Sequence, residues 1–281
     1  MRKFIALVLM IPILFASACI SDTDDGGEGK IGIVVSIPPY YEWASMVGGE
    51  NVEVTILIPE GQSPHTYEPT PSQMIKVSEA SIWVKNGVGL EFWADKVIEN
   101  NSDIDIVDIS EGIDLIPIDG GYDAHVWLSI INAMNGVQSI YESLSGIDPE
   151  NADYYRENME SYLEDLEAMD RYLKEKLESA SGNRFIVFHP AWSYFSREYG
   201  LEQIAIEEDG KEPGPEMIVS IIEMARDYGI NVIFVEPQFS IENAQVIANE
   251  IDGVVISINP LSSDYIENMR TVANALVEGL A

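Results

Sequence analysis

Short apolar runs alternate with segments of helical spacing along most of the chain. In the first half, runs bounded by Gly, Pro and Asp indicate four buried strands, at Ile31–Ile37, Val52–Ile58, Ile82–Lys85 and Ile104–Ile109. Helical spacing is found between and after these runs, at Tyr40–Val47, Pro71–Ala80, Glu91–Glu99 and Leu128–Leu144. This alternation predicts a parallel sheet with helices on both of its faces.

The pattern changes at Asp148. Asp148 and Pro149 are suited to begin a helix, and neither Gly nor Pro follows until about Ala180. Apolar side chains recur there every three or four residues, at Tyr155, Met159, Tyr162, Leu166, Met169, Leu173 and Leu177. A helix of ~30 residues is roughly 45 Å long at 1.5 Å per residue. The segment therefore predicts a rigid helix that runs the length of a two-lobed molecule.

The second half repeats the pattern of the first. Strands are expected at Phe185–Phe188, Gln203–Ile206, Val232–Val235 and Val254–Ile258, and helices at Trp192–Tyr199, Pro215–Tyr228, Ile241–Ile251 and Ser263–Leu280. The prediction is an α/β fold of two Rossmann-like lobes with parallel sheets, joined by one long helix. We expect the N-terminal lobe at 31–147, the helix at 148–181 and the C-terminal lobe at 182–281.

The N-terminus has the pattern of an export signal. A short basic start is followed by an apolar stretch that is too short for a comfortable membrane span and that ends in small residues before Cys19, the only cysteine. Residues 1–18 are interpreted as a signal peptide. The stretch resembles a lipoprotein signal, which implies that Cys19 is lipidated and that residues 19–30 form a tether. We therefore expect an exported protein on the outer face of the cytoplasmic membrane, in the periplasm or at the cell surface.

Charge and composition exclude some functions. The chain of 281 residues is 46% hydrophobic, as globular proteins are, and carries a formal net charge of −33. A field of this sign repels phosphate backbones, so nucleic acid is not an expected partner. The chain also lacks the Gly-x-x-x-x-Gly-Lys-Ser/Thr phosphate loop, so it does not itself hydrolyse ATP in this way.

The chain has three histidines, and each lies in a loop after an apolar run. His65 follows the second predicted strand through a proline-rich loop, His125 follows the fourth, and His189 directly follows the first strand of the second lobe. Ligands bind beyond the carboxyl ends of the strands in open parallel sheets, so all three side chains are expected in the cleft between the lobes. Three imidazoles suit a zinc ion and leave one coordination position for an oxygen donor.

Several motifs place these histidines in a known context. Gly61 to Gln73, the His125-Val126-Trp127-Leu128 run and the Phe188-His189-Pro190-Ala191 turn resemble the zinc and manganese solute-binding lipoproteins of ABC transporters, as do Phe234 to Gln238 and Asn259-Pro260-Leu261. The resemblance covers the chain from Ile31 to Leu280. It implies one metal ion between two lobes, held by His65, His125 and His189. Histidine at the third of these positions is the zinc type, and a nitrogen-rich site suits zinc better than manganese.

The fourth ligand remains open. The family commonly has an aspartate where this chain has Asn259, whose amide oxygen can coordinate but brings no charge. Glu236 is a second candidate, either as a ligand or as a hydrogen-bond partner of a bound water, and a water is a third. Glu207, Glu208 and Glu212, in the loop after the second predicted strand of the second lobe, are more distant candidates, which we interpret as surface charges. The short segment before His125 contains no histidine, so a single site without an auxiliary chelating loop is expected.

The function predicted from these observations is that of a non-enzymatic, extracellular Zn²⁺ receptor. It would deliver the ion to a permease that works with a cytoplasmic ATPase, and we expect it to be a monomer. Manganese or iron(II) transport is an alternative within the same family. Two alternatives of other classes are a zinc hydrolase, because three histidines and a water also form a catalytic site, and a surface adhesin stabilised by metal.

Overall fold

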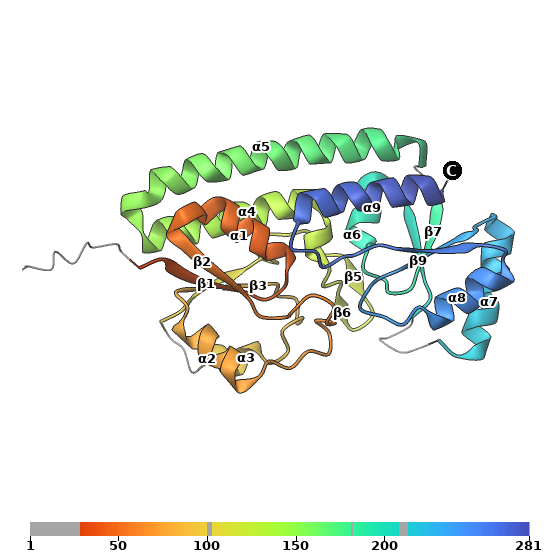
Figure 1. Cartoon of the computed structure of the whole chain (residues 1–281), viewed down its shortest axis with the longest axis horizontal. Helices are drawn as coiled ribbons and strands as arrows, with labels where there is room; N and C mark the ends of the chain where they lie inside the picture. The colour runs from red at the N-terminus through yellow and green to blue at the C-terminus, as the bar shows by residue number, and fades with distance from the viewer. Residues whose placement is uncertain (1–28, 100–102, 181, 208–212, 281) are drawn as a thin grey trace, which may run out of the picture.

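The structure is a computed structural model that describes residues 29–99, 103–180, 182–207 and 213–280 (Figure 1). The expected signal peptide, Cys19 and nearly all of the tether lie outside the described residues, as do Glu208 and Glu212. Within the described ranges, no helix combines the length and the apolar character that crossing a membrane requires.

The first lobe is built on a parallel sheet with the strand order β2-β1-β3-β4. Its strands are β1 (Ile31–Val35), β2 (Val52–Ile56), β3 (Ile82–Lys85) and β4 (Asp105–Asp108). The helices of this part are α1 (Pro39–Gly48), α2 (Pro71–Glu79), α3 (Ala94–Ile98) and α4 (Ile130–Ile147). The predicted parallel sheet between two helical layers is confirmed (Figure 1).

The second lobe repeats this topology with the order β10-β9-β7-β8, also all parallel. Its strands are β7 (Arg184–Val187), β8 (Glu202–Ala205), β9 (Val232–Val235) and β10 (Val254–Ser257), and its helices are α6 (Ser193–Tyr199), α7 (Pro215–Tyr228), α8 (Glu242–Glu250) and α9 (Tyr265–Gly279). In both lobes the first strand lies between the second and the third. The strand order therefore reverses beside β1 and beside β7, where parallel sheets form binding crevices.

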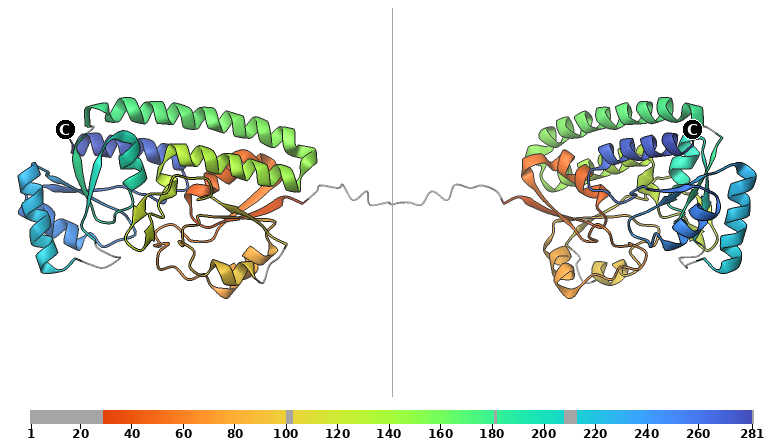
Figure 2. Two further views of the ribbon diagram at one scale, coloured as in Figure 1. Left: turned by 180° about the vertical axis from the view of Figure 1, so that it is seen from behind. Right: turned by 45° about the vertical axis from the view of Figure 1, so that its right-hand side comes forward.

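Helix α5 (Ala152–Leu177) runs along both lobes, as predicted (Figures 1 and 2). Short 3₁₀ turns precede it at Pro149–Asn151 and follow it at Glu178–Ala180. All seven apolar positions of the predicted stripe are buried. The stripe packs on the same hydrophobic cluster that holds apolar residues of both lobes, so one continuous core joins them.

Side-chain alternation along the strands separates this shared core from two smaller ones. Ile33 and Val35 of β1 belong to the shared core, whereas Val34 belongs to a cluster under α2 and α3. In β7, Phe185 belongs to the shared core and Ile186 to a cluster under α7 and α8. Successive strand residues point to opposite faces, so each sheet is buried on both sides.

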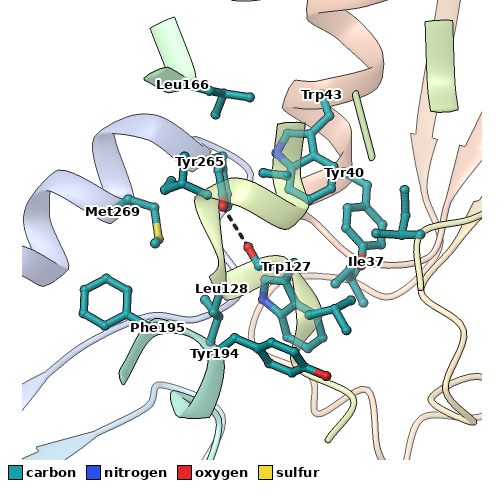
Figure 3. Close-up of a cluster of buried hydrophobic side chains, with 14 of the residues drawn as sticks. Ile37, Tyr40, Trp43, Trp127, Leu128, Leu166, Tyr194, Phe195, Tyr265 and Met269 are labelled. Carbon is teal, nitrogen blue, oxygen red and sulfur yellow. Dashed lines mark hydrogen bonds between the residues drawn. The ribbon is translucent and has the colours of Figure 1, made fainter. Parts of the chain in front are cut away.

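Trp127 and Tyr265 connect the two lobes by hydrogen bonds within the shared core (Figure 3). The Tyr265 hydroxyl, at the start of α9, donates a hydrogen bond of 2.7 Å to the backbone oxygen of Trp127. The Trp127 indole N–H donates one of 2.7 Å to the backbone oxygen of Pro260. Trp127 immediately follows the segment that carries His125, so these contacts also fix that side of the cleft.

The sequence did not predict one element, the antiparallel hairpin of β5 (Pro117–Ile118) and β6 (Gly121–Tyr122). Strands of two residues are too short to show a period-two pattern. The hairpin matters for the site because Ile118 and Tyr122 line the same open cleft as the three histidines.

Candidate metal centre

The three histidines converge from loops at the carboxyl ends of strands in both lobes. His65 lies in the loop after β2, His125 follows the β5–β6 hairpin, and His189 lies two residues after β7. The Nε2 atoms of His65 and His125 are 3.0 Å apart, those of His125 and His189 are 3.0 Å apart, and those of His189 and His65 are 3.2 Å apart. Residues separated by up to 124 positions in the chain thus present one triangle of nitrogen atoms.

The size of the triangle suits a metal ion. Zinc–nitrogen bonds of about 2.0–2.1 Å in a tetrahedron place the ligand atoms about 3.3 Å apart. The observed Nε2 separations are slightly shorter than this, so a small outward movement of the rings would accommodate the ion. On one side of the triangle is a cavity of about 10 Å³, whose walls include Trp127 and Leu261. The same histidines also line an open cleft of about 770 Å³.

Asp123 orients the His125 ring. Its Oδ1 accepts a hydrogen bond of 2.9 Å from the His125 backbone N–H and lies 2.7 Å from the ring Nδ1. Burial would raise the pKa of Asp123, but hydrogen bonds, led by that from His125, leave it below its usual range. The carboxylate is therefore ionised and holds the proton of the imidazole on Nδ1. Nε2 then carries the lone pair that a metal needs.

Glu207 plays the corresponding part for His189. Its Oε2 lies 3.0 Å from Nδ1 of His189, and the residue is only 7% exposed. Phe239 stacks on the imidazole, with the ring centroids 4.9 Å apart and the planes 26° apart. Each lobe thus contributes one histidine that a buried carboxylate holds in the metal-binding tautomer.

His65 is positioned differently, because it is the one exposed member of the triangle. Its loop is fastened by Gln73, whose side-chain amide donates hydrogen bonds of 2.6 Å to the Leu57 backbone oxygen and 2.8 Å to the Tyr67 hydroxyl. Although the residue as a whole is exposed, its Nε2 faces the other two rings, and loss of water there, aided by the charge that His125 can carry, lowers the pKa of His65 to about 3. Burial also lowers the pKa of His125. Both rings are therefore neutral and able to coordinate at neutral pH.

The other two residues considered as ligands are engaged elsewhere. Glu236, at the end of β9, is fully buried; its Oε2 accepts a hydrogen bond of 3.1 Å from the His189 backbone N–H, and its Oε1 accepts one of 3.2 Å from the Trp192 indole. Burial raises the pKa of Glu236 to about 7. The Asn259 Oδ1 accepts a hydrogen bond of 3.0 Å from the Leu261 backbone N–H. Among the described His, Cys, Asp and Glu residues, the group whose possible ligand atoms all lie within 4.8 Å of one another consists of the three histidines and includes no carboxylate.

The arrangement is that of a binding site for a borderline metal ion. Three imidazole nitrogen atoms face one point, and two buried carboxylates on the far side of the rings can balance the charge of a cation. Sequence reasoning did not consider Asp123 and interpreted Glu207 as a surface charge. The signal for Asp123 was its place two residues before His125. The signal for Glu207 was its place just after the second strand of its lobe, and the parallel pairing of β7 and β8 brings it beside His189.

Comparison with known proteins agrees with this geometry. Residues 33–279 match the family described as "Zinc-uptake complex component A periplasmic". The chain belongs to this family. The family covers both lobes and all three histidines, and the resemblance inferred from the motifs is thereby confirmed.

Members of the family differ in the metal that their names specify. The chain is 30% identical to the manganese-binding lipoprotein MntA of Halalkalibacterium halodurans, over 98% of each chain. It is 28% identical to the high-affinity zinc uptake system protein ZnuA of Bacillus subtilis, over 98% of this chain and 95% of the relative. A crystal structure of ZnuA superposes with a TM-score of 0.87 at 35% identity, over 90% of this chain and 100% of the other. The protein is thus a metal-binding, substrate-binding protein of the ABC transporter class.

Proposed function

We propose that the protein captures Zn²⁺ outside the cytoplasmic membrane and delivers it to the permease of an ABC importer. The choice of zinc rests on the triangle of three Nε2 atoms. Among the described residues, no carboxylate oxygen belongs to this group of possible ligands. Nitrogen donors favour zinc, whereas manganese prefers sites rich in carboxylate oxygen. In this proposal His65, His125 and His189 bind the ion directly, while Asp123 and Glu207 orient two of the rings.

Receptor function, as opposed to catalysis, is in keeping with the surroundings of the triangle. A hydrolase would need a carboxylate that is free for acid–base chemistry beside the metal, but both oxygens of Glu236 accept hydrogen bonds from protein groups. The shared core and the contacts of Trp127 hold the lobes in a fixed relation, which preorganises the ligands. The proposal includes a monomer that a lipid on Cys19 attaches to the membrane.

The test is calorimetric titration of the metal-stripped mature chain with Zn²⁺ and, separately, with Mn²⁺ and Fe²⁺. The proposal predicts one zinc per chain and weaker binding of the two other metals. Tighter binding of manganese or iron would assign the protein to that metal instead. Replacement of Cys19 by Ala, followed by membrane fractionation of producing cells, tests the anchor separately, because the variant should lose membrane attachment but keep its zinc affinity.

A further inference from the structure

A hydroxyl group from the second lobe interrupts the base of the β5–β6 hairpin. Pro117 pairs with Tyr122 at the open end of this antiparallel ladder. The next pair in register is Ile116 and Asp123, and the Asp123 backbone N–H donates a hydrogen bond of 2.9 Å to the Ile116 oxygen. In a regular ladder the same two residues exchange a second bond, from the Ile116 N–H to the Asp123 oxygen. The Tyr194 hydroxyl takes the place of that bond, because it accepts from the Ile116 N–H over 3.2 Å and donates to the Asp123 backbone oxygen over 2.9 Å.

Tyr194 is held in this position by its surroundings. Its side chain is fully buried in the shared core (Figure 3). The Arg197 guanidinium lies 5.2 Å from the centre of its ring and donates a hydrogen bond of 3.1 Å to the backbone oxygen of Asp114, in the segment before the hairpin. Ser193, the first residue of α6, adds a side-chain hydrogen bond to Asp123 that helps to keep the pKa of this carboxyl group low. Three residues of α6 thus hold the segment that leads to the second histidine.

Asp123 connects these contacts to the triangle of histidines. Its Oδ1 accepts the His125 backbone N–H over 2.9 Å and lies 2.7 Å from the ring Nδ1. Tyr194 in turn follows His189 by five residues, since the turn that carries His189 leads directly into α6. The helix that begins just after one histidine therefore holds the residue that orients another. A shift of α6 relative to the hairpin would move His125 relative to His189, and their Nε2 atoms would no longer face one point.

We propose that Tyr194 is a positioning residue of the metal site, whose hydroxyl spaces the base of the hairpin so that His125 stays in register with His189. The hydroxyl acts through Asp123 and does not contact the metal. In its absence the Ile116 N–H and the Asp123 oxygen are free to bond each other directly, as in a regular ladder. That bond would draw Asp123 toward Ile116 and turn His125 away from the other two rings. This inference rests on the proposed function, because it presumes an ion held by the three histidines.

The test compares Tyr194→Phe with Tyr199→Phe in the metal-stripped mature chain. Tyr194→Phe keeps the ring and removes only the hydroxyl. Tyr199→Phe is the matched control on the same helix, because the Tyr199 hydroxyl donates its bond of 3.2 Å to Oδ1 of Asp170 in α5. We expect Tyr194→Phe to weaken zinc binding about tenfold, the lower end of the range for loss of a group that orients a metal ligand. It should also change the visible absorption of the cobalt(II)-loaded protein, which reports the ligand field, whereas Tyr199→Phe should leave both at the parent values.

Urea unfolding of the metal-free proteins separates positioning from stability. A purely structural role of Tyr194 would lower the stability of the variant without changing the cobalt spectrum. Equal zinc affinity and equal spectra in Tyr194→Phe and Tyr199→Phe would therefore overturn this inference and leave the proposed function intact. A parent chain that does not bind zinc through its histidines would overturn both.

A second variant decides the question if Tyr194→Phe does not fold. Ser193→Ala removes the other hydrogen bond from α6 to Asp123, at a half-buried position at the start of the helix. Weaker zinc binding with a changed cobalt spectrum in Ser193→Ala would support the positioning of Asp123 by α6. Unchanged binding and an unchanged spectrum would overturn it.

Discussion

Oε2 of Glu207 lies 3.0 Å from Nδ1 of His189, and this contact joins the loops that follow two neighbouring strands, β7 and β8. The contact keeps the imidazole proton on Nδ1, so that Nε2 faces the other two histidines. Asp123 holds His125 in the same way, at 2.7 Å. Two of the three proposed ligands are thus preorganised before the metal arrives, and the third, His65, is the exposed one.

Replacement of Glu207 by Gln should weaken zinc binding. The amide of the new glutamine can still contact the ring, but it lacks the negative charge that makes the imidazole a stronger electron donor to the metal. Loss of such a partner typically costs about 10–100-fold in metal affinity. Competition with a chromogenic chelator measures the change. Glu216→Gln, on the exposed face of α7, is the control, and equal affinities in the two variants would show that Glu207 does not act on the metal.

Each of the substitutions His65→Ala, His125→Ala and His189→Ala should lower zinc affinity far more than Glu207→Gln, because each removes a nitrogen donor. Metal-free circular dichroism and urea unfolding separate this effect from misfolding. His65→Ala is the most informative of the three, since its side chain is exposed and its loss should disturb the core least. An unchanged zinc affinity in any of the three would remove that residue from the site.

Acidification should release zinc, but at a lower pH than a site of ordinary imidazoles would require. Protonated imidazole cannot coordinate, so affinity falls as the pH drops toward the pKa values of the metal-free ligands. Burial lowers the pKa of His65 to about 3 and that of His125 below its usual value. Protons therefore compete weakly at neutral pH and more strongly at low pH. Zinc titrations at a series of pH values check this, and a steep fall that already begins at pH 7 would contradict it.

Glu198 should make the metal-free protein less stable at alkaline pH. Burial raises its pKa to about 7; its Oε1 accepts a hydrogen bond from Ser129, and its Oε2 has no partner among the described residues. The carboxyl group therefore keeps its proton up to about pH 7 in the folded protein, but only up to about pH 4.5, the ordinary value, in the unfolded chain. The free energy of unfolding falls across this interval, and the loss is complete once the pH has risen through 7. Glu198→Gln should raise the free energy of unfolding by about 1–3 kcal/mol at pH 8 but not at pH 5.

Urea unfolding of Glu198→Gln and the parent chain at both pH values is the measurement. The same change at pH 5 and pH 8 would show that the carboxyl group is not protonated in the folded protein. Glu164→Gln, on the exposed face of α5, is the control and should change neither value.

Leu166→Ala should destabilise the whole molecule and not one lobe alone. Leu166 is fully buried in the core that both lobes share, so its truncation is expected to cost about 2–5 kcal/mol. Calorimetric unfolding should show a single transition at a lower temperature. Two separate transitions would contradict a common core.

Much of the fold was predictable because its signals are local. Buried parallel strands are short apolar runs, and α5 carries an unbroken apolar stripe on one face, so both appear in the sequence. The hairpin at Pro117–Tyr122 was missed because its strands have two residues each. The hydrogen bonds that tie α9 to Trp127 and Glu42 were also beyond prediction, since they join positions more than 130 residues apart.

The same distinction applies to the site. The chain has only three histidines, and this small number made them candidate ligands of a single site. The predicted strand topology then placed all three in one cleft, as the structure shows. The carboxylates could not be assigned in this way, because the chain has 48 acidic residues and most of them give no positional signal. Burial decides among them: Asp123 and Glu207 are nearly inaccessible beside the imidazoles, and Glu236 is turned toward backbone and indole N–H groups.

The most direct test of zinc selectivity is a competition experiment. The metal-stripped protein is mixed with one equivalent of Zn²⁺ and a large excess of Mn²⁺, and the bound metal is determined by mass spectrometry after rapid removal of free ions. Three imidazole ligands without a carboxylate ligand predict one zinc and little manganese per chain. Retention of manganese in place of zinc would contradict both the proposed metal and the ligand set of His65, His125 and His189.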